Sequence, residues 1–428
     1  MNPGTILVAD FETNWGNKSM KSNTVNIAVI GLGGRGHGMM CTLLAMDDVR
    51  IVGLCDVYPD RVERSAKAVE EVYGKAPFTS QNYHDILARE DVDGVLITTC
   101  WQMHLRIAID AMNAGKYVAS EVGGACSIDE CWELVRTSRR TGKPCMLLEN
   151  CCYGREELAL LNMVKQGLFG EMIHCRCGYE HDLRDEVAMG HINRHYRLDN
   201  YMHRNGDVYP THGAVPMGKI LNVNRGNRFI SLVSMATKAR GLNEWSAKHM
   251  PADNEVQGYP FAQGDVVTTM IKCAHGETLV LTHDTTLPRP YSRGGYVQGT
   301  KGVWMEENRG IMLEGETEPH VWSAFDPILQ KYEHPIWKWY QEAGIQGGHG
   351  GMDYLVLRAY VESVQAQTDT PIDVYDFATY AAITPLSENS IATGSMPQPF
   401  PDFTNGGYLV REPERCWKYS LSEVCRDF

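Results

Sequence analysis

A glycine-rich turn followed by an acid is the first pattern in this chain that could do chemistry. Gly31, Gly33 and Gly36 follow an apolar run at residues 25–30, and Asp56 closes a second apolar run twenty residues after the last glycine. Glycine permits a tight turn, close approach of a pyrophosphate and close packing of the next helix, whose N-terminus attracts phosphate. The layout therefore predicts a dinucleotide site.

The same acid indicates which dinucleotide binds. A carboxylate at the end of the second strand accepts hydrogen bonds from a ribose diol and repels a 2′-phosphate. Val57 and Tyr58 offer no positive charge for that phosphate, and Arg61 is expected on the next helix. The pattern favours NAD over NADP. The structural alternative for Asp56 is a cap for the helix that begins near Pro59.

Polar and aromatic side chains also follow the later predicted strands of this half. Trp101 and His104 follow one strand, Glu121 the next, and Glu149 with Asn150 the last. Ligands of an open parallel sheet bind beyond the carboxyl ends of its strands. We expect Trp101 and His104 to contact the nicotinamide half of the cofactor, with simple packing as the alternative for Trp101.

The second half of the chain carries a dense set of groups suited to acid–base chemistry. They are Tyr179, His181, Arg197, Tyr209, His212 and Tyr291. Tyr179 and His181 share a face if they lie on a strand, so both can point at one substrate. Several such groups on strand ends and loops predict a catalytic site.

Two kinds of element have to position these residues. Strands and helices alternate through residues 25–150, which predicts βαβ units on a doubly wound parallel sheet of the Rossmann type. After a helix at 155–166, alternating runs at 172–179, 229–237, 266–273 and 278–283 predict a large, mainly antiparallel open sheet, and helices are expected at 352–365 and 374–392. The fold class is thus α/β plus α+β, and the open sheet suggests a homo-oligomer, a dimer or more.

The predicted organisation has four parts. Residues 1–24 form a flexible leader, with Met20 as an alternative natural start; residues 25–150 bind NAD; residues 151–400 bind substrate; residues 401–428 form a tail. The leader's apolar run is too short for a signal peptide.

Composition excludes several classes of protein. The 428 residues are 43% hydrophobic and 22% charged with a net charge of −13, which is ordinary for a globular enzyme and argues against a nucleic-acid partner. No apolar run is long enough to span a membrane. The thirteen cysteines lack metal-ligand or framework spacing, so reduced thiols, no metal and a cytoplasmic location are expected, with the periplasm left open.

Longer motifs carry a family resemblance. The first half is similar to the glucose–fructose oxidoreductase/inositol dehydrogenase superfamily, and residues 25 to 405 resemble glycoside hydrolase family 109, a family of NAD-dependent α-N-acetylgalactosaminidases. The matching stretches include residues 99–104, 129–132, 146–150, 162–171, 203–213, 224–229, 236–242, 348–353 and 383–388.

The resemblance implies a set of site residues. Cofactor contacts would fall on the turn with Gly31, Gly33, Gly34, Arg35 and Gly36, on Asp56, on Trp101, Gln102 and His104, and on Glu121, Val122 and Asn150. Sugar contacts would fall on Tyr179, Arg197, Tyr209, Pro210, Thr211, His212 and Tyr291, with His181 and Glu149 close by.

The resemblance also implies a mechanism. Tightly bound NAD⁺ would oxidise C3 of the sugar, a base would remove the acidified C2 proton, the C1 group would leave by elimination, and water addition and re-reduction would complete a cycle without net redox. Tyr179 is the expected base for C2 and His212 for the C3 hydroxyl, with Glu149 and His181 orienting them or protonating the leaving group.

Rival functions remain open from sequence. An NAD-dependent sugar dehydrogenase or epimerase could use the same pocket, but Val122 stands where that superfamily usually has its catalytic lysine, and Val208 stands where it has an aspartate before the histidine. A redox-sensing or scaffolding protein would explain the fold but leave the Tyr, His and Arg set without a role.

Overall fold

The first sheet has the strand order of a Rossmann fold. The computed structural model describes residues 24–412 and 416–428, so the predicted leader lies outside the described residues apart from its last position. Six parallel strands run in the order β3-β2-β1-β4-β5-β6. They are β1 Val25–Ile30, β2 Val49–Cys55, β3 Phe78–Ser80, β4 Gly94–Ile97, β5 Tyr117–Ser120 and β6 Cys145–Leu147. The order reverses between β1 and β4, where such sheets bind ligands.

Helices connect these strands as the alternating sequence predicts. They are α1 Gly34–Leu44, α2 Pro59–Tyr73, α3 Tyr83–Leu87, α4 Trp101–Asn113 and α5 Ile128–Thr141. Ser127 and Glu130 cap α5 reciprocally. Trp101 is the first residue of α4. Trp101 is therefore held by a helix as well as by the preceding strand.

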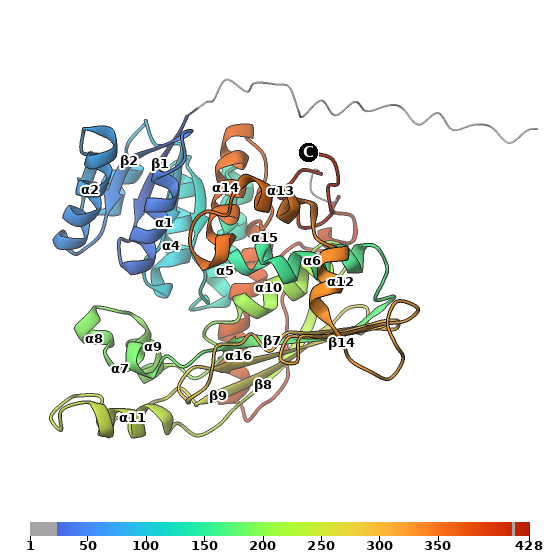
Figure 1. Ribbon diagram of the computed structural model, residues 1–428. Helices are drawn as coiled ribbons and strands as arrows, with labels where there is room; N and C mark the ends of the chain where they lie inside the picture. The colour runs from blue at the N-terminus through green and yellow to red at the C-terminus, as the bar shows by residue number, and fades with distance from the viewer. Residues whose placement is uncertain (1–23, 413–415) are drawn as a thin grey trace, which may run out of the picture.

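The second sheet is large and mainly antiparallel, as predicted. Its order is β14-β13-β12-β11-β7-β10-β9-β8-β15, with only β7 and β10 paired in parallel. The strands are β7 Met172–Glu180, β8 Phe229–Ala236, β9 Val266–Cys273, β10 Thr278–Asp284, β11 Tyr296–Gly299, β12 Gly302–Met305, β13 Gly310–Leu313, β14 Ser323–Ala324 and β15 Gln398–Pro399. Helices α10 (Thr211–Ile220) and α16 (Ile383–Ala392) pack on this sheet (Figure 1).

Further helices follow in the second half of the chain, and most were not predicted. They are α6 Arg155–Lys165, α7 Arg184–Ala188, α8 Gly190–Asn193, α9 Arg197–His203, α11 Gly241–His249, α12 Phe325–Lys331, α13 Pro335–Ala343, α14 Met352–Ala366 and α15 Val374–Ala381, with 3₁₀ turns η1 Asn150–Tyr153, η2 His349–Gly351 and η3 Gly407–Leu409. The single helix expected at 374–392 is two, because Pro385 has no N–H for the carbonyl of Ala381, which accepts from Ala125 N instead.

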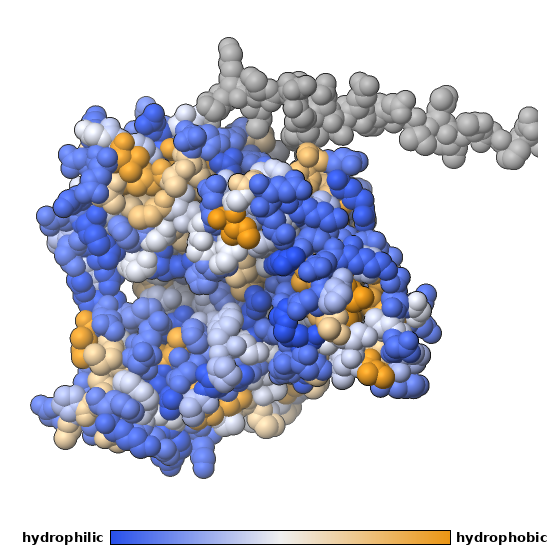
Figure 2. Space-filling model, in the orientation of Figure 1, coloured by the Kyte–Doolittle hydropathy of each residue, from blue (hydrophilic) through white to orange (hydrophobic). Residues whose placement is uncertain are grey.

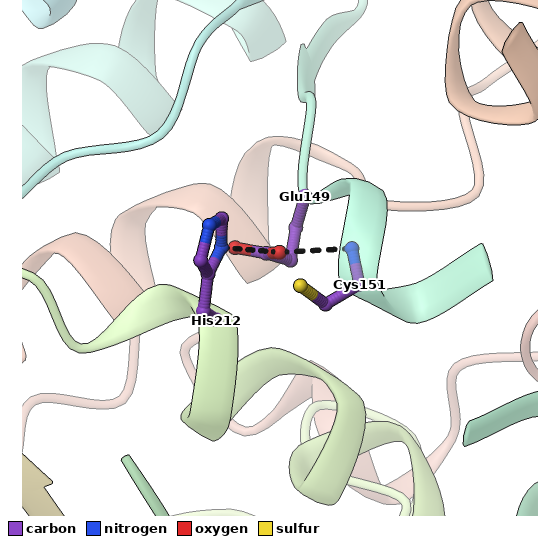
Figure 3. A group of neighbouring side chains, drawn as sticks. All are labelled: Glu149, Cys151 and His212. Carbon is purple, nitrogen blue, oxygen red and sulfur yellow. Dashed lines mark hydrogen bonds and ion pairs between the residues drawn. The ribbon is translucent and has the colours of Figure 1, made fainter. Parts of the chain in front are cut away.

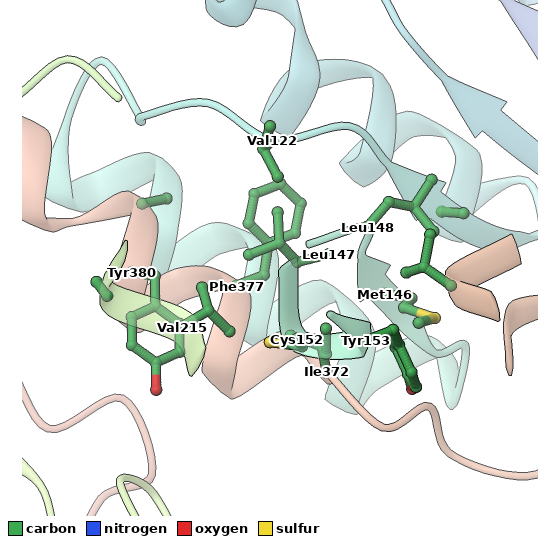
Figure 4. Close-up of a cluster of buried hydrophobic side chains, with 14 of the residues drawn as sticks. Val122, Met146, Leu147, Leu148, Cys152, Tyr153, Val215, Ile372, Phe377 and Tyr380 are labelled. Atoms are coloured by element: carbon green, nitrogen blue, oxygen red, sulfur yellow. The ribbon is translucent and has the colours of Figure 1, made fainter. Parts of the chain in front are cut away.

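The late helices return to the first sheet. Helix α14 packs on α1, β1 and η1, and α15 packs on α5 and β6. The N–H of Leu147 in β6 donates to the carbonyl of Ile372 at 3.0 Å. Figure 4 shows side chains of both halves in one buried cluster, with Phe377 and Val215 beside Leu147 and Val122. The two halves therefore share a hydrophobic core, and the domain boundaries given above stay a prediction.

Two further findings concern the termini and surface. The structure joins Cys416 and Cys425 by a disulfide, which corrects the expectation that every thiol is reduced; the other eleven cysteines are free. Buried Tyr419 accepts at its carbonyl from the hydroxyl of Tyr153, so the predicted tail packs on the body of the protein. Within the described residues, none of the helices has the length and apolar character to span a membrane.

Candidate active site

The glycine-rich turn has the geometry that a pyrophosphate requires. Gly31 has a positive φ of 98°, and a Cβ there would lie 2.6 Å from the Thr98 carbonyl carbon. A Cβ on Gly36 would lie 2.1 Å from the Gly31 oxygen, so α1 can pack closely only because residue 36 is glycine. A Cβ on Gly34 would meet no described atom within 4 Å. The outer side of the turn thus leaves space at the N-terminus of α1, which fits a nucleotide phosphate.

Asp56 is not the helix cap that the alternative interpretation required. Its carboxylate accepts from the N–H groups of Leu32 at 2.6 Å and Tyr58 at 2.9 Å, while Tyr58 is the N-cap residue of α2. Arg61 lies on α2 as expected, yet it also reaches back to within 3.9 Å of the carboxylate. That pairing opposes capture of a 2′-phosphate by Arg61, which is consistent with NAD.

Trp101 and His104 behave differently although both belong to α4. Trp101 is buried beside the rings of Tyr196 and Tyr209, at centroid distances of 4.9 and 5.6 Å, and its Nε1 has no hydrogen-bond partner among the described residues. The ring of His104 bonds the Thr99 carbonyl at 3.0 Å, and burial lowers its pKa to about 4. His104 is therefore neutral and supports the loop after β4.

The loops after β5 and β6 are tied to the turn by polar contacts. Oε1 of Glu121 accepts from Nε of Arg35 at 2.9 Å, and its other oxygen accepts from the N–H of Val122 at 3.1 Å. Asn150 donates to Asp353, which also binds Arg35. Sequence reasoning missed Asp353, although it lies within the matching stretch 348–353 and a carboxylate after three glycines was the available signal.

Glu149 and His212 form a buried pair across the two halves (Figure 3). His212 Nδ1 lies 2.7 Å from Oε1 of Glu149, which also accepts from the N–H of Cys151 at 3.1 Å. Burial lowers the pKa of His212, but the Cys151 sulfur and the Glu149 carboxylate outweigh it, so the net pKa lies well above the ordinary value. Burial raises the pKa of Glu149, but His212 and the Cys151 N–H outweigh it and leave the pKa below its usual range. The pair is thus ionised.

The same three side chains bear on the expectation of no metal. Donor atoms of Glu149, Cys151 and His212 lie within 4.8 Å of one another, a spacing compatible with a cation. Two of the donors already share the hydrogen bond of the ionised pair. The absence of a metal therefore stays a prediction.

Tyr179 and His181 meet as the strand alternation predicts. The Tyr179 hydroxyl lies 3.1 Å from Nδ1 of His181. Burial lowers the pKa of His181, and the Arg197 cation lowers it further, so this ring is neutral and can accept a proton. The Tyr179 ring lies 5.4 Å from the ring of His212, which brings the two predicted bases into one pocket.

Arg197 is the buried cation of this pocket. Its Cζ lies 5.3, 5.7 and 5.0 Å from the ring centroids of Trp101, Tyr179 and Tyr209. Its Nε lies 2.9 Å from Glu186, but neither Nε nor Nη1, both buried, makes a hydrogen bond to a described residue. A buried guanidinium N–H without a partner favours a ligand oxygen at this point.

The remaining predicted residues border the pocket. Pro210 is the N-cap residue of α10 and Thr211 its first residue, so the 209–212 segment aims His212 inward. Tyr291 is 52% exposed with its ring 5.1 Å from that of His181, which places it at the rim. Gln102 donates to Asn200 at 3.2 Å. Figure 2 shows the surface hollowed between the nucleotide-binding half and the segment that holds α7, α8 and α9.

The fold and this site define an enzyme that combines a Rossmann NAD-binding domain with an acid–base pocket beyond the same strand ends. Residues 25–148 match the oxidoreductase family with an NAD-binding Rossmann fold, and residues 153–410 match the C-terminal domain of glycosyl hydrolase 109. The chain belongs to glycosyl hydrolase family 109, as the sequence motifs predict.

Known relatives and structures agree with this assignment. The chain is 42% identical to a glycosyl hydrolase family 109 protein of Stenotrophomonas maltophilia (strain K279a), covering 92% of each chain. It is 41% identical to an alpha-N-acetylgalactosaminidase of Tannerella forsythia, covering 90% of this chain and 87% of the relative. A levoglucosan dehydrogenase in complex with NADH has the same fold, with a TM-score of 0.66, 17% identity and coverage of 88% and 99%.

Proposed function

We propose that this glycosidase hydrolyses terminal N-acetylgalactosaminides, with the α anomer preferred, and that it retains one NAD through successive turnovers. The observation that carries the proposal is the pocket in which the Tyr179–His181 and Glu149–His212 pairs lie together, beyond the strands of the nucleotide sheet. Two relatives named alpha-N-acetylgalactosaminidase, at 41% and 38% identity, support the sugar.

The structure fits NAD at the turn of Gly31 to Gly36, at Asp56 and at the loops of Trp101, Glu121 and Asn150. When bound there, NAD⁺ would supply a hydride acceptor for C3 of the sugar and return the same hydride at the end of each turnover, with no net redox. The protein's own residues then have to move protons and exclude water.

Proton transfer is assigned to the two pairs. His212 is assigned to the C3 hydroxyl through Nε2, since Nδ1 is engaged by Glu149, which orients the ring. Because the ionised pair holds a proton on Nε2, the ring takes the hydroxyl proton only after it has released that one. Tyr179 takes the C2 proton, which the neighbouring ketone makes acidic, while its own hydroxyl proton passes to the neutral His181 ring over their 3.1 Å contact. The protonated His181 then gives this proton to the C1 group, which leaves by elimination, and water adds to the unsaturated ketone.

Substrate binding is assigned to the aromatic and cationic groups. The free N–H of Arg197 suits the carbonyl oxygen of an N-acetyl group, and the rings of Tyr209 and Tyr291 offer apolar faces to the sugar. Pro210 and Thr211 shape the wall next to His212. Because elimination needs no displacement at C1, the anomer is set by contacts around the aglycone.

The test is a panel of aryl glycosides of both anomers, assayed in D₂O with the protein as purified. We expect release of aryl alcohol from the N-acetylgalactosaminides without added NAD⁺, and deuterium at C2 of the sugar product. Cleavage without C2 exchange would overturn the mechanism. Accumulation of NADH with sugar oxidation, and no cleavage, would replace it with a dehydrogenase.

The open sheet also supports a homo-oligomer. One face of the second sheet packs on α10 and α16, and the opposite face carries Met235 and Met270, which are 65% and 50% exposed. Val233 lies directly across from Met270, so the apolar side chains form one patch. We propose a second copy of the chain as the partner that covers it.

A further inference from the structure

A glycine-rich loop of the second half reaches the nucleotide turn, although the proposed chemistry gives it no role. Residues 344–351 include five glycines, and α14 begins directly after them. Gly351 has a φ of 101°, and a Cβ there would lie 2.7 Å from the ring of Tyr340. This left-handed turn, which only glycine can make without strain, aims Asp353 in the first turn of α14 toward α1.

The Asp353 carboxylate is buried, with the residue 4% exposed, and it accepts hydrogen bonds from several side chains. It accepts from both terminal nitrogens of Arg35, at 2.6 and 2.9 Å, from Nδ2 of Asn150 at 2.8 Å, and from Nδ1 of His349 at 2.8 Å. Burial would raise the pKa of Asp353, but the bonds from His349 and Arg35 hold it well below its usual range. The carboxylate is therefore charged whenever the protein is folded.

These donors come from separate walls of the NAD site. Arg35 lies in the first turn of α1, after β1, and Asn150 is the first residue of η1, after β6. Arg35 also binds Glu121 of the loop after β5, at 2.9 Å. One carboxylate, 318 residues from Arg35 and 203 from Asn150, thus cross-links the start of α1 to the segment after β6.

We propose that Asp353 is a positioning residue that retains NAD, acting through Arg35 and Asn150 and holding the 344–351 loop by His349. Arg35 keeps 34% of its side chain exposed; without Asp353 it retains the bond to Glu121 but loses the two-point contact that fixes its guanidinium. Arg35 and Asn150 are then no longer held by one shared carboxylate, and NAD dissociates faster. This inference rests on the retention of NAD that the proposed function requires.

A purely structural role is the rival explanation, because Asp353 also docks α14. The chain offers a matched control. Arg358, on the same helix, binds Asp48 at 2.7 and 3.1 Å. Asp48 precedes β2 and so lies at the amino ends of the parallel strands, whereas the nucleotide turn lies at their carboxyl ends. Asp353→Asn and Asp48→Asn each remove one carboxylate that joins α14 to the Rossmann half, but only the first touches the NAD site.

The experiment measures exchange of bound NAD for labelled NAD in the full-length protein as purified, without any sugar. Hydrogen bonds to charged groups contribute about 1.5–3 kcal/mol, so we expect Asp353→Asn to exchange about 10- to 100-fold faster than wild type and to carry less NAD per chain. Asp48→Asn should exchange within about twofold of wild type. The melting temperature at saturating NAD reports any general damage.

A double variant tests the route through Arg35. If Asp353 acts through Arg35, adding Arg35→Gln to Asp353→Asn should accelerate exchange much less than the product of the two single effects. Equal exchange in Asp353→Asn and wild type, or equal acceleration in Asp48→Asn, would overturn the inference. If Asp353→Asn fails to fold, His349→Ala carries the same test at an exposed loop, with a smaller acceleration expected.

The readout is independent of glycosidase activity. A wild type that holds NAD but cleaves no glycoside would refute the proposed function and leave this inference standing. An Asp353→Asn variant that cleaves its glycoside and retains NAD normally would refute only the inference.

Discussion

At the scale of single residues, environment decides which side chain can move a proton. His181 and His212 border the same pocket, yet burial and the Arg197 cation lower the pKa of His181, while Cys151 and Glu149 raise that of His212. One imidazole is thereby neutral and the other ionised near neutral pH. His181 can therefore accept a proton directly, whereas His212 has to lose one before it can act as a base.

Replacing Tyr179 by Phe tests the base for C2. Loss of a positioned general base should lower kcat by about 10²- to 10⁴-fold while NAD exchange stays unchanged, because the hydroxyl contacts His181 rather than the turn. Tyr296→Phe, on strand β11 of the second sheet, is the control and should keep wild-type turnover. Comparable kcat values for Tyr179→Phe and wild type would remove Tyr179 from the mechanism.

Asp207 gives a pH-dependent prediction. Burial raises the pKa of Asp207 to about 7, and its Oδ2 has no hydrogen-bond partner in the described part of the chain. The folded state keeps a proton that the unfolded chain releases near pH 4, so stability declines as the pH rises from about 4 to 7 and no further above that. Asp207→Asn cannot ionise and should escape this loss.

The measurement is the difference in melting temperature between wild type and Asp207→Asn from pH 5 to 8. We expect the stability of wild type to fall by about 2.5 kcal/mol relative to Asp207→Asn, mostly between pH 5 and 7, with little further change up to pH 8. A difference that is constant with pH would contradict the assignment. Glu130→Gln, at the capped start of α5, is a control that should shift both ends of the interval alike.

At the scale of elements, the first turn of α10 positions His212. Gly213 follows His212 and lies against β7, where a Cβ would come within 2.6 Å of the Cys177 sulfur and 2.8 Å of the Gly178 nitrogen. A backbone atom cannot yield as a side chain can, so any larger residue has to push α10 away from the sheet. The start of α10 and the His212 imidazole would move together.

Gly213→Ala should therefore lower turnover by about 100-fold, since small displacements of a catalytic group have effects of that size. NAD exchange should stay near wild type, because the turn at Gly31 to Gly36 is on another element. The matched control is Gly38→Ala in α1, where a Cβ meets no described atom within 4 Å and activity should persist. Similar turnover in both variants would show that α10 tolerates the shift.

At the scale of the whole molecule, the chain returns to its first sheet after building the second. Helices α14 and α15 pack on β1, β6 and α5, so residues after 350 help to build the NAD half. The candidate active site lies where Glu149, just before η1, meets His212 in the first turn of α10. Neither half could assemble this pocket by itself, because Glu149 comes from one half and His212 from the other.

The exposed face of the second sheet makes a prediction about assembly. Met270→Asp places a charge in the patch of Val233, Met235 and Met270, and should lower the molar mass measured by light scattering from that of an oligomer to that of a monomer. Val72→Asp, an exposed apolar site on α2, should leave the mass unchanged. A monomeric wild type would refute the proposed oligomer.

The sequence by itself determined the Rossmann half, the mainly antiparallel sheet and the glycine turn with Asp56, and it predicted most residues of the candidate pocket. Those features depend on local signals: period-two alternation, glycine spacing, and the β7 face that Tyr179 and His181 share. The same signals could not show that α4 begins at Trp101 or that Pro385 ends one helix and begins another.

Only the tertiary structure decided the ion pair of Glu149 with His212 and the contact of Asp353 with Arg35 and Asn150. These partners lie from 63 to 318 residues apart in the chain, and nothing in local spacing reports such distances. Burial settled the rest, because the pKa of a histidine or an aspartate depends on the charges and solvent that the folded chain places around it.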